Sequence, residues 1–324
     1  MRRCVMRAIV SSSGPTTFPC WAMRQGPRAT HALKISPEGA PIVTRVVCGG
    51  LVALDLVLDV AAHPTVGEKH RAPASRLSVG GGACNAAAAI ARLGGHALLV
   101  GTVGDDAFGE ILRARIRDIG IDDSLLRTST KTRTSHSAIT ITPDGERTIV
   151  NFRVDAEMDS AALLPDHLAF EAALADTRFP IMAEALMGAA RRRQVPGVMD
   201  AEAPVAPALK ALRAASHVAF SSQGLQDFCG GADGQALEEA SARLGRWVGV
   251  TRGPDPVSCH DGTSMIDVPV PDVTPIDTLG AGDTWHAAFA LALAEGATET
   301  EAIQSANETA AQKVCRLPPW DEPT

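Results

Sequence analysis

Asp277-Thr278-Leu279-Gly280-Ala281-Gly282-Asp283 is the stretch that decides both the fold and the chemistry of this chain. It follows a proline-rich, strand-like run at 268–275 and precedes a strong helix-forming run that starts at Thr284. We therefore place Gly280, Ala281 and Gly282 at a helix N-terminus, where unpaired N–H groups and the helix dipole attract a phosphate. Asp283 then falls in the first turn, within reach of a hydroxyl that attacks this phosphate. The alternative is an ordinary helix after a Gly-rich turn, but the stretch favours a phosphoryl-transfer site.

Composition bounds the class of protein. The chain has 324 residues, enough for one large α/β domain or two modest ones, and 45% of the residues are hydrophobic. No apolar stretch reaches the roughly 20 residues that cross a bilayer, so we expect no membrane partner. The net charge of −7 argues against nucleic acid as a partner. The cysteines are scattered without a CxxC pair, which argues against a local zinc site, and a reducing cytoplasm fits best.

Residues 1–40 differ in composition from the rest. They carry six basic residues and one acidic residue and are rich in Ser, Thr, Pro and Gly. An arginine-rich, acid-poor segment can be a transit peptide. A disordered extension, or a start codon placed too far upstream with Met23 as an internal start, explains the composition more simply. We therefore predict that residues 1–40 are a disordered or wrongly assigned extension and that residues 41–324 form the folded domain.

Strands and helices alternate along this domain. Apolar runs predict strands at 42–48, 51–60, 97–103, 172–176, 195–200, 217–221 and 247–251, and helical patterns occupy 85–93, 107–119, 180–193, 204–214 and 235–244. The alternation predicts an α/β fold with a parallel sheet and helices on both faces. The segments near 66–80 and 132–153 do not fit this sheet. We expect them to form a small β lid, with a hairpin turn at Asp144-Gly145.

A second polar cluster follows the first strands. Ligands bind outside the carboxyl ends of the strands in open parallel sheets, and Asp55 lies shortly after the first strand. Gly80, Gly81 and Gly82 would let the backbone approach a ligand closely, and Asn85 offers both donor and acceptor groups. The alternative is a plain turn in which Asn85 caps the next helix.

Two stretches together resemble the signatures of the ribokinase (pfkB) family of sugar kinases. They are GGGACNAAAAIARLG at 80–94 and the opening stretch at 277–283, and VGDDAFG at 103–109 also matches. The resemblance covers about 42–317 and implies a ribokinase-like sandwich with a β lid. It also implies ATP and Mg²⁺ as cofactors, a monovalent cation in some members, and a sugar as the other small-molecule partner. Asp105 and Asp106 are expected to be structural, as helix caps.

The resemblance assigns roles to individual residues. It implies that Asp283 is the base and that Gly280, Ala281 and Gly282 form the anion hole. Sugar hydroxyls would contact Asp55, Gly81 and Asn85. ATP would be bound by Thr251, Gly253, Thr278, Gly280 and Gly282. The lid strands would pair between two subunits and bury their edges, so that a homodimer is expected.

Within the family, the chain is most similar to the bacterial sulfofructose kinases, at 145–151, 174–178 and 217–221, and the ketohexokinases also look similar at 47–55. The first likeness implies that Lys69, Asn151 and Arg178 hold a sulfonate, and converging charged donors suit such an anion. Each has an ordinary alternative, respectively a lid surface charge, a hairpin edge and a helix-start ion pair. The expected activity is phosphorylation of a primary hydroxyl of a ketohexose such as 6-deoxy-6-sulfofructose. Fructose, fructose 6-phosphate, ribose and nucleosides are the alternatives.

Three departures from the family pattern concern ATP and the metal. Pro256 stands where the family usually has a second glycine, which removes a backbone donor near the phosphates. The Asn-x-x-Glu element that orders magnesium in many relatives is absent near 221–224, so Asp200 and Glu202 are the candidates for ordering the metal's waters. The tail after Lys313 lacks the usual Gly-rich turn and final helix. These departures leave a non-catalytic sugar-binding regulatory protein as the alternative of another class.

Overall fold

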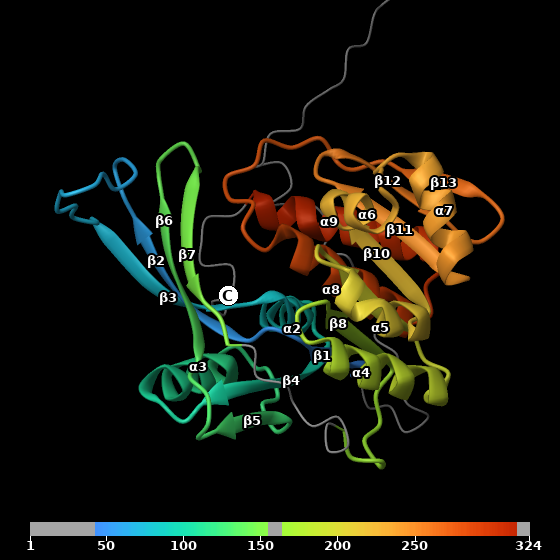
Figure 1. Cartoon of the computed structure of the whole chain (residues 1–324), viewed down its shortest axis with the longest axis horizontal. Helices are drawn as coiled ribbons and strands as arrows, with labels where there is room; N and C mark the ends of the chain where they lie inside the picture. Colours follow the sequence, from blue (N-terminus) through green and yellow to red (C-terminus); the bar gives the residue numbers. More distant parts are fainter. Residues whose placement is uncertain (1–42, 155–163, 316–324) are drawn as a thin grey trace, which may run out of the picture.

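The computed structural model describes residues 43–154 and 164–315, which form a large helix-covered sheet and a smaller sheet that projects from it (Figure 1). The extension predicted at 1–40 and the tail after residue 315 lie outside the described residues. None of the helices in the described ranges combines the length and the apolar character that crossing a bilayer requires.

The large sheet has nine strands and is parallel except at one edge, where the last two strands are added by antiparallel pairing. Its central sequences are almost continuously apolar, as expected of strands with both faces covered. All the parallel strands therefore end at the same side of the sheet. In spatial order the strands are β13 (Met265–Val268), β12 (Asp255–His260), β11 (Trp247–Arg252), β10 (His217–Ser221), β9 (Gly197–Ala201), β8 (Ala172–Asp176), β1 (Arg45–Gly49), β4 (His96–Gly104) and β5 (Leu126–Ser129).

Helices cover both faces of this sheet and bury two apolar clusters against it. One cluster is rich in alanine and aromatic residues, including Trp285 and Phe289, and it packs beneath α2 (Gly82–Arg92), α3 (Ala107–Asp118), α8 (Ala281–Ala294) and α9 (Glu299–Val314). The other contains Met182 and Leu186 and packs beneath α4 (Pro180–Arg193), α5 (Leu209–Ala214), α6 (Ser222–Cys229) and α7 (Gly234–Leu244). The predicted layered α/β architecture is therefore present.

The smaller sheet, seen at the left of Figure 1, corresponds to the predicted lid, but it also contains the strand predicted at 51–60, which was not assigned to the lid. Its strands lie in the order β3 (Ala74–Gly80), β2 (Ala53–Asp59), β6 (Ser135–Ile141) and β7 (Arg147–Phe152). The pairing register aligns Asp55, Ser137 and Asn151 across β2, β6 and β7. Because register partners point to the same face of a sheet, these three side chains form one polar row.

Several boundaries differ from the prediction. The strand-like run predicted at 268–275 is wrong beyond its first residue, because β13 ends at Val268 and residues 269–275 lie in no strand. Its prolines lack the N–H that a sheet needs. The helix predicted at 204–214 is a short 3₁₀ turn (Ala206–Ala208) followed by α5. The prediction also omitted β5, β12, β13, α6 and α9.

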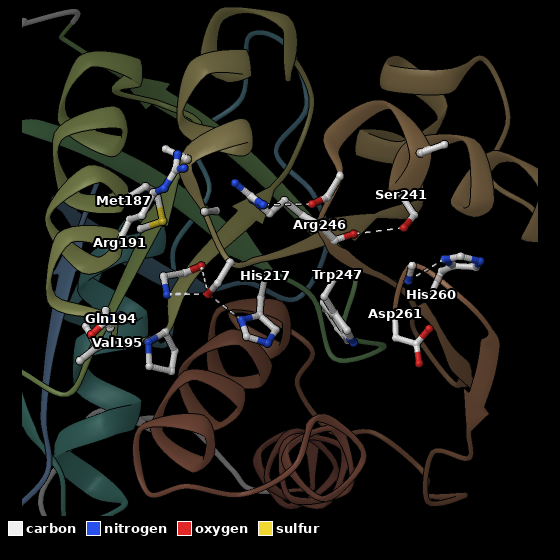
Figure 2. Close-up of a pocket in the computed structure, with 18 of the residues that line it drawn as sticks. Met187, Arg191, Gln194, Val195, His217, Ser241, Arg246, Trp247, His260 and Asp261 are labelled. Atoms are coloured by element: carbon white, nitrogen blue, oxygen red, sulfur yellow. Dashed lines mark hydrogen bonds between the residues drawn. The ribbon is translucent and has the colours of Figure 1, made fainter.

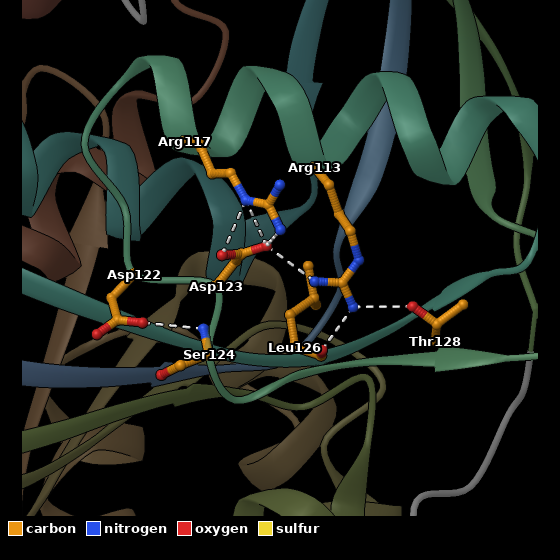
Figure 3. A network of polar contacts seen from close by, with 7 residues as sticks. All are labelled: Arg113, Arg117, Asp122, Asp123, Ser124, Leu126 and Thr128. Carbon is orange, nitrogen blue, oxygen red and sulfur yellow. Dashed lines mark hydrogen bonds and ion pairs between the residues drawn. The ribbon is translucent and has the colours of Figure 1, made fainter.

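Two polar networks fix α3 at the base of the lid. Figure 3 shows Arg113, which donates to Asp123 at 2.9 Å, to the Leu126 carbonyl at 2.5 Å and to Thr128 at 3.0 Å, so that α3 is tied to β5. At the other end of α3, Asp106 caps the helix by accepting from the Gly109 N–H at 2.9 Å, which confirms its predicted capping role. Asp106 also accepts from the backbone and hydroxyl of Thr134, just before β6.

Candidate active site

A cleft of about 260 Å³ lies between the lid and the carboxyl ends of the central strands. The lid contributes the polar row of Asp55, Ser137 and Asn151. The large sheet and its helices contribute the carboxylates of Asp176, Asp200, Glu202 and Asp283, together with Gly81, Gly82, Asn85 and Arg178. Most of the predicted acceptor-side residues therefore meet in one place, although they come from distant parts of the sequence.

Asp283 is positioned by two helix N-termini. It lies in the first turn of α8, whose N-cap is Gly280 with a left-handed φ of 70°. Asn85 in α2 donates its side-chain amide to Asp283 Oδ2 at 2.7 Å. Burial and the charge of Asp200 raise the pKa of Asp283 to about 7, against the opposing effect of the Asn85 hydrogen bond. A carboxylate with a pKa near neutrality is well suited to accept a proton from a hydroxyl.

The turn before Asp283 offers backbone donors to an anion. Within the described residues the N–H groups of Gly282 and Asp283 have no hydrogen-bond acceptor, whereas the N–H of Ala281 donates to the Thr278 carbonyl at 3.2 Å. Of the residues predicted to form the anion hole, Ala281 has its N–H already bonded. The N–H of Asp283 is available in its place. A Cβ built on Gly282 would meet no atom within 4 Å, so the space beside this turn is open. This arrangement suits a phosphate at a helix N-terminus.

The other glycine-rich turn lets carboxylates approach the backbone. A Cβ on Gly80 would lie 2.2 Å from Asp55 Oδ2, and one on Gly82 would lie 3.4 Å from Asp283 Oδ1. Gly81, with a φ of 87°, is the N-cap of α2, which begins at Gly82. The alternative in which Asn85 caps this helix is therefore wrong, because Asn85 lies inside the first turns and its side chain reaches Asp283.

Two residues that were given no site role from the sequence support the cleft: Asp176 lines it, and His286 is buried beside Asp200. Asp176 ends β8 and accepts from the N–H groups of Leu51 at 2.8 Å and Arg178 at 2.9 Å, and burial raises its pKa to about 6. His286 is buried in α8, with Nδ1 2.8 Å from the Gly282 carbonyl and Nε2 3.6 Å from Asp200 Oδ1. Burial also raises the pKa of Asp200. In the sequence, Asp176 is the last residue of a predicted strand and part of the 174–178 likeness, and neither feature assigns its carboxyl group to the site.

The residues predicted to hold a sulfonate are only partly together. Asn151 and Arg178 line the cleft, whereas Lys69 is exposed in the loop between β2 and β3 and does not line it. Arg178 forms an ion pair with Glu202 and donates to the Ala203 carbonyl at 3.2 Å. The helix-start ion pair considered as the alternative for Arg178 is therefore present, in addition to its place in the cleft.

The predicted metal residues differ in their availability. Among the described residues, no three His, Cys, Asp or Glu side chains are grouped so as to hold a metal ion. Mg²⁺ in kinases is held largely by phosphates and waters with one or two carboxylates. Asp200 fits that requirement because its carboxylate lines the cleft. Glu202 fits less well, because its carboxylate is engaged by Arg178.

The loop that carries the anion hole is anchored from two sides. Lys313, buried in α9, donates to the Asp277 carbonyl at 3.2 Å and to its carboxylate at 3.4 Å. The N–H groups of Ile276 and Asp277 both donate to the Val314 carbonyl. From the lid, Arg147 donates to Thr278 Oγ1 at 3.0 Å. Arg147 belongs to the 145–151 likeness, but neither Arg147 nor Lys313 was given a role from the sequence, because each contact depends on long-range packing.

The residues predicted for the nucleotide side lie along the next strands. Thr251 is near the end of β11, and Gly253, with a φ of 64°, makes the turn into β12. Pro256 lies in β12 beside a register shift between Val250 and Arg252, and β12 pairs with β13 only from Val257 onward. A proline is tolerated at such an irregularity because no ladder hydrogen bond is required of it.

A larger cavity of about 1010 Å³ lies at the opposite end of the sheet (Figure 2). Three helices end beside it, with their C-caps at Gln194, Ala215 and Gly245. Helix C-termini present carbonyl groups and a partial negative charge, which disfavours a phosphate. The smaller cleft, with its helix N-termini and carboxylates, is therefore the better candidate for phosphoryl transfer.

Comparison with known proteins identifies the family. A family model described as pfkB family carbohydrate kinase matches residues 43–318. Ribokinase from Bacillus subtilis is 27% identical over 271 residues, which cover 82% of this chain and 91% of that protein. A candidate ribokinase from Agrobacterium tumefaciens has a TM-score of 0.78 and 30% identity, covering 86% of this chain and 93% of that one. Ribokinase from Arabidopsis thaliana, solved with ribose and ATP, shares the fold with a TM-score of 0.69 at 23% identity, over 84% and 93% of the two chains. The fold is therefore ribokinase-like, and this protein belongs to the pfkB family of carbohydrate kinases, which makes it a phosphotransferase.

Proposed function

We propose that the protein transfers the γ-phosphoryl group of ATP to a primary hydroxyl of a ketohexose-like sugar, with 6-deoxy-6-sulfofructose as the leading candidate. The observation that carries this proposal is the Asn85–Asp283 hydrogen bond of 2.7 Å at the open N-terminus of α8, opposite the polar row of the lid. A carboxylate and unpaired amides at one helix start supply the two requirements of phosphoryl transfer, a proton acceptor and an anion site.

Each residue has a role in this scheme. Asp55 and Asn85 would bind sugar hydroxyls and direct one of them to Asp283, and Asn151 and Arg178 would hold the sulfonate. Asp283 would accept the proton of that hydroxyl, and the amides of Gly282 and Asp283 would stabilise the charge on the transferred group. Thr251, Gly253 and Thr278 are the candidates for holding ATP. Bound Mg²⁺ would neutralise phosphate charge, with Asp200 as the residue to order its waters.

An ADP-release screen tests the function directly. Purified protein would be assayed with Mg²⁺-ATP and each of 6-deoxy-6-sulfofructose, fructose 6-phosphate, fructose, ribose and adenosine. We expect the sulfonated sugar to give the highest kcat/KM. A preference for ribose or adenosine would contradict the proposed substrate and leave the kinase activity intact. Arg178→Ala should raise the KM of an anionic sugar and leave the KM of a neutral sugar unchanged.

The outer face of the lid supports a homodimer as the working form. Leu56, Ala138 and Val150 are register partners across β2, β6 and β7, on the face opposite the Asp55 row, and the row continues in β3 to Leu77, which packs against the core. Leu56 is 38% exposed and Val150 is 69% exposed. Such a row would be covered by a second copy of the lid. Light scattering should give a dimer mass that Val150→Lys lowers to the monomer, whereas Val66→Lys, in an exposed loop, should have no effect.

A further inference from the structure

Arg153 stands where two cavities meet. The acceptor cleft of about 260 Å³ adjoins a second cavity of about 280 Å³, and the residues common to both linings are Leu51, Arg153 and Arg178. The second cavity is otherwise walled mainly by apolar residues and prolines, namely Val154, Thr177, Phe179, Pro180, Pro204 and Pro207. A sugar that fills the cleft would therefore meet two arginines where the cleft joins the second cavity.

The two arginines differ in how their charges are compensated. Arg178 is held by Glu202 and by the Ala203 carbonyl, so its position is fixed and its charge is partly neutralised. Arg153 is exposed and makes no hydrogen bond or ion pair with any residue that the structure describes. One uncompensated guanidinium therefore remains at the mouth of the cleft. Arginine offers a planar set of donors that matches carboxylate, sulfonate and phosphate groups.

The charged residues of the cleft are divided between its two sides. Five carboxylates line the cleft alone, namely Asp55, Asp176, Asp200, Glu202 and Asp283, whereas Arg153 and Arg178 also line the adjoining cavity. A sugar with an anionic group at one end would be repelled by the carboxylates and attracted by the arginines. Its charged end would then point toward the adjoining cavity, and its far hydroxyl would point toward Asp283. This orientation is the one that phosphorylation requires.

We propose that Arg153 is a specificity-determining residue whose guanidinium, together with Arg178, binds the anionic group of the sugar substrate. The ligand class is a sugar that carries a sulfonate, carboxylate or phosphate at the end remote from the accepting hydroxyl. The inference rests on the proposed function and deepens it, because it adds a cation inside the cleft, whereas Lys69 lies outside it. The adjoining cavity gives the charged substituent room beyond the sugar ring.

Binding and turnover together test this inference. Isothermal titration without ATP would measure the affinity of wild-type protein, Arg153→Ala, Arg153→Lys and Arg192→Ala for 6-deoxy-6-sulfofructose, fructose 6-phosphate and a hexulosonate. Arg192 is an exposed arginine of α4 and serves as the matched control. For the anionic sugar that binds best, Arg153→Ala should weaken binding about tenfold or more, because a charge-assisted hydrogen bond is lost. Arg153→Lys should recover part of this loss, and Arg192→Ala should bind as the wild type does.

The outcomes separate the inference from the proposed function. The affinity for fructose, which carries no charge, should be the same in Arg153→Ala and in the wild type. Equal affinities of Arg153→Ala and wild type for every anionic sugar, or no binding of any anionic sugar by the wild type, would overturn the role of Arg153 even if ADP is released with neutral sugars. Conversely, Arg153-dependent binding without ADP release from any sugar would support the anion site and contradict the proposed function.

Discussion

Replacement of Asp283 by asparagine is the sharpest perturbation of the proposed chemistry. The change keeps the size of the side chain, and the new amide oxygen can still accept from Asn85, which now lies 2.7 Å from Asp283 Oδ2. The proton acceptor alone is removed. Loss of a general base typically lowers the reaction rate about 10²–10⁴-fold. We expect kcat to fall by this amount, while the KM values for sugar and ATP change little.

The same variant should be more stable than the wild type at alkaline pH. Burial and Asp200 raise the pKa of Asp283 from an ordinary value of 3.8 to about 7. An acid with a raised folded-state pKa loses folding stability as pH rises through this range, because only the unfolded state releases its proton early. Asp283→Asn should therefore increase Tm relative to the wild type at pH 8, and the difference should shrink toward pH 4.

Steady-state ADP release and scanning calorimetry measure these two effects, and Asp118→Asn, an exposed residue at the end of α3, provides the control. A kcat within a few-fold of the wild type would refute the role of Asp283 as base. A Tm that falls equally at pH 8 and pH 5 would refute the argument that its charge opposes folding.

Three further perturbations follow from the same structure. In the wild type, kcat/KM should decline as pH falls below about 7, because Asp283 must be ionised to accept a proton; a profile that is flat from pH 8 to pH 5.5 would be inconsistent with this. Asn85→Ala removes the hydrogen bond that lowers the Asp283 pKa, so the decline of kcat/KM at acid pH should begin at a higher pH and kcat should fall about tenfold. An unchanged pH profile would argue against the hydrogen bond between Asn85 and Asp283. Arg113→Ala should lower the free energy of unfolding, measured in urea, by about 1–3 kcal/mol, because a half-buried network loses its donor. Arg117 is more exposed, and Arg117→Ala should lower it by less than about 1 kcal/mol. Equal losses would contradict the difference in burial.

Local chemistry made much of the fold predictable from the sequence. The buried strands are continuous apolar runs, and the predicted helix at 180–193 coincides with α4. Gly280 at the N-cap of α8 and Asp283 in its first turn also agree with the prediction. These features depend on a few neighbouring residues, whose conformational preferences favour the same structure that the complete fold adopts.

The remaining parts of the site depend on contacts between distant residues. Asp176 falls in the 174–178 likeness without a role assigned to it and His286 falls in no quoted stretch, so their significance appears only when β8, β9 and α8 are packed together. The polar row of Asp55 and Asn151 results from strand register, which cannot be read from either strand alone. The start of α2 was misplaced because Gly81 acts as the cap through its left-handed backbone and needs no side chain.

The anchoring of residues 276–278 has a consequence for how the protein is made. This loop is fastened to Lys313 and Val314 in the last described helix, whereas its catalytic partner Asn85 is synthesised much earlier. Until α9 has been synthesised, the phosphate-binding turn lacks the partners that hold residues 276–278 in place. We therefore expect catalytic competence to be acquired only late in translation, after the sugar-binding residues of the lid and α2 have long been made.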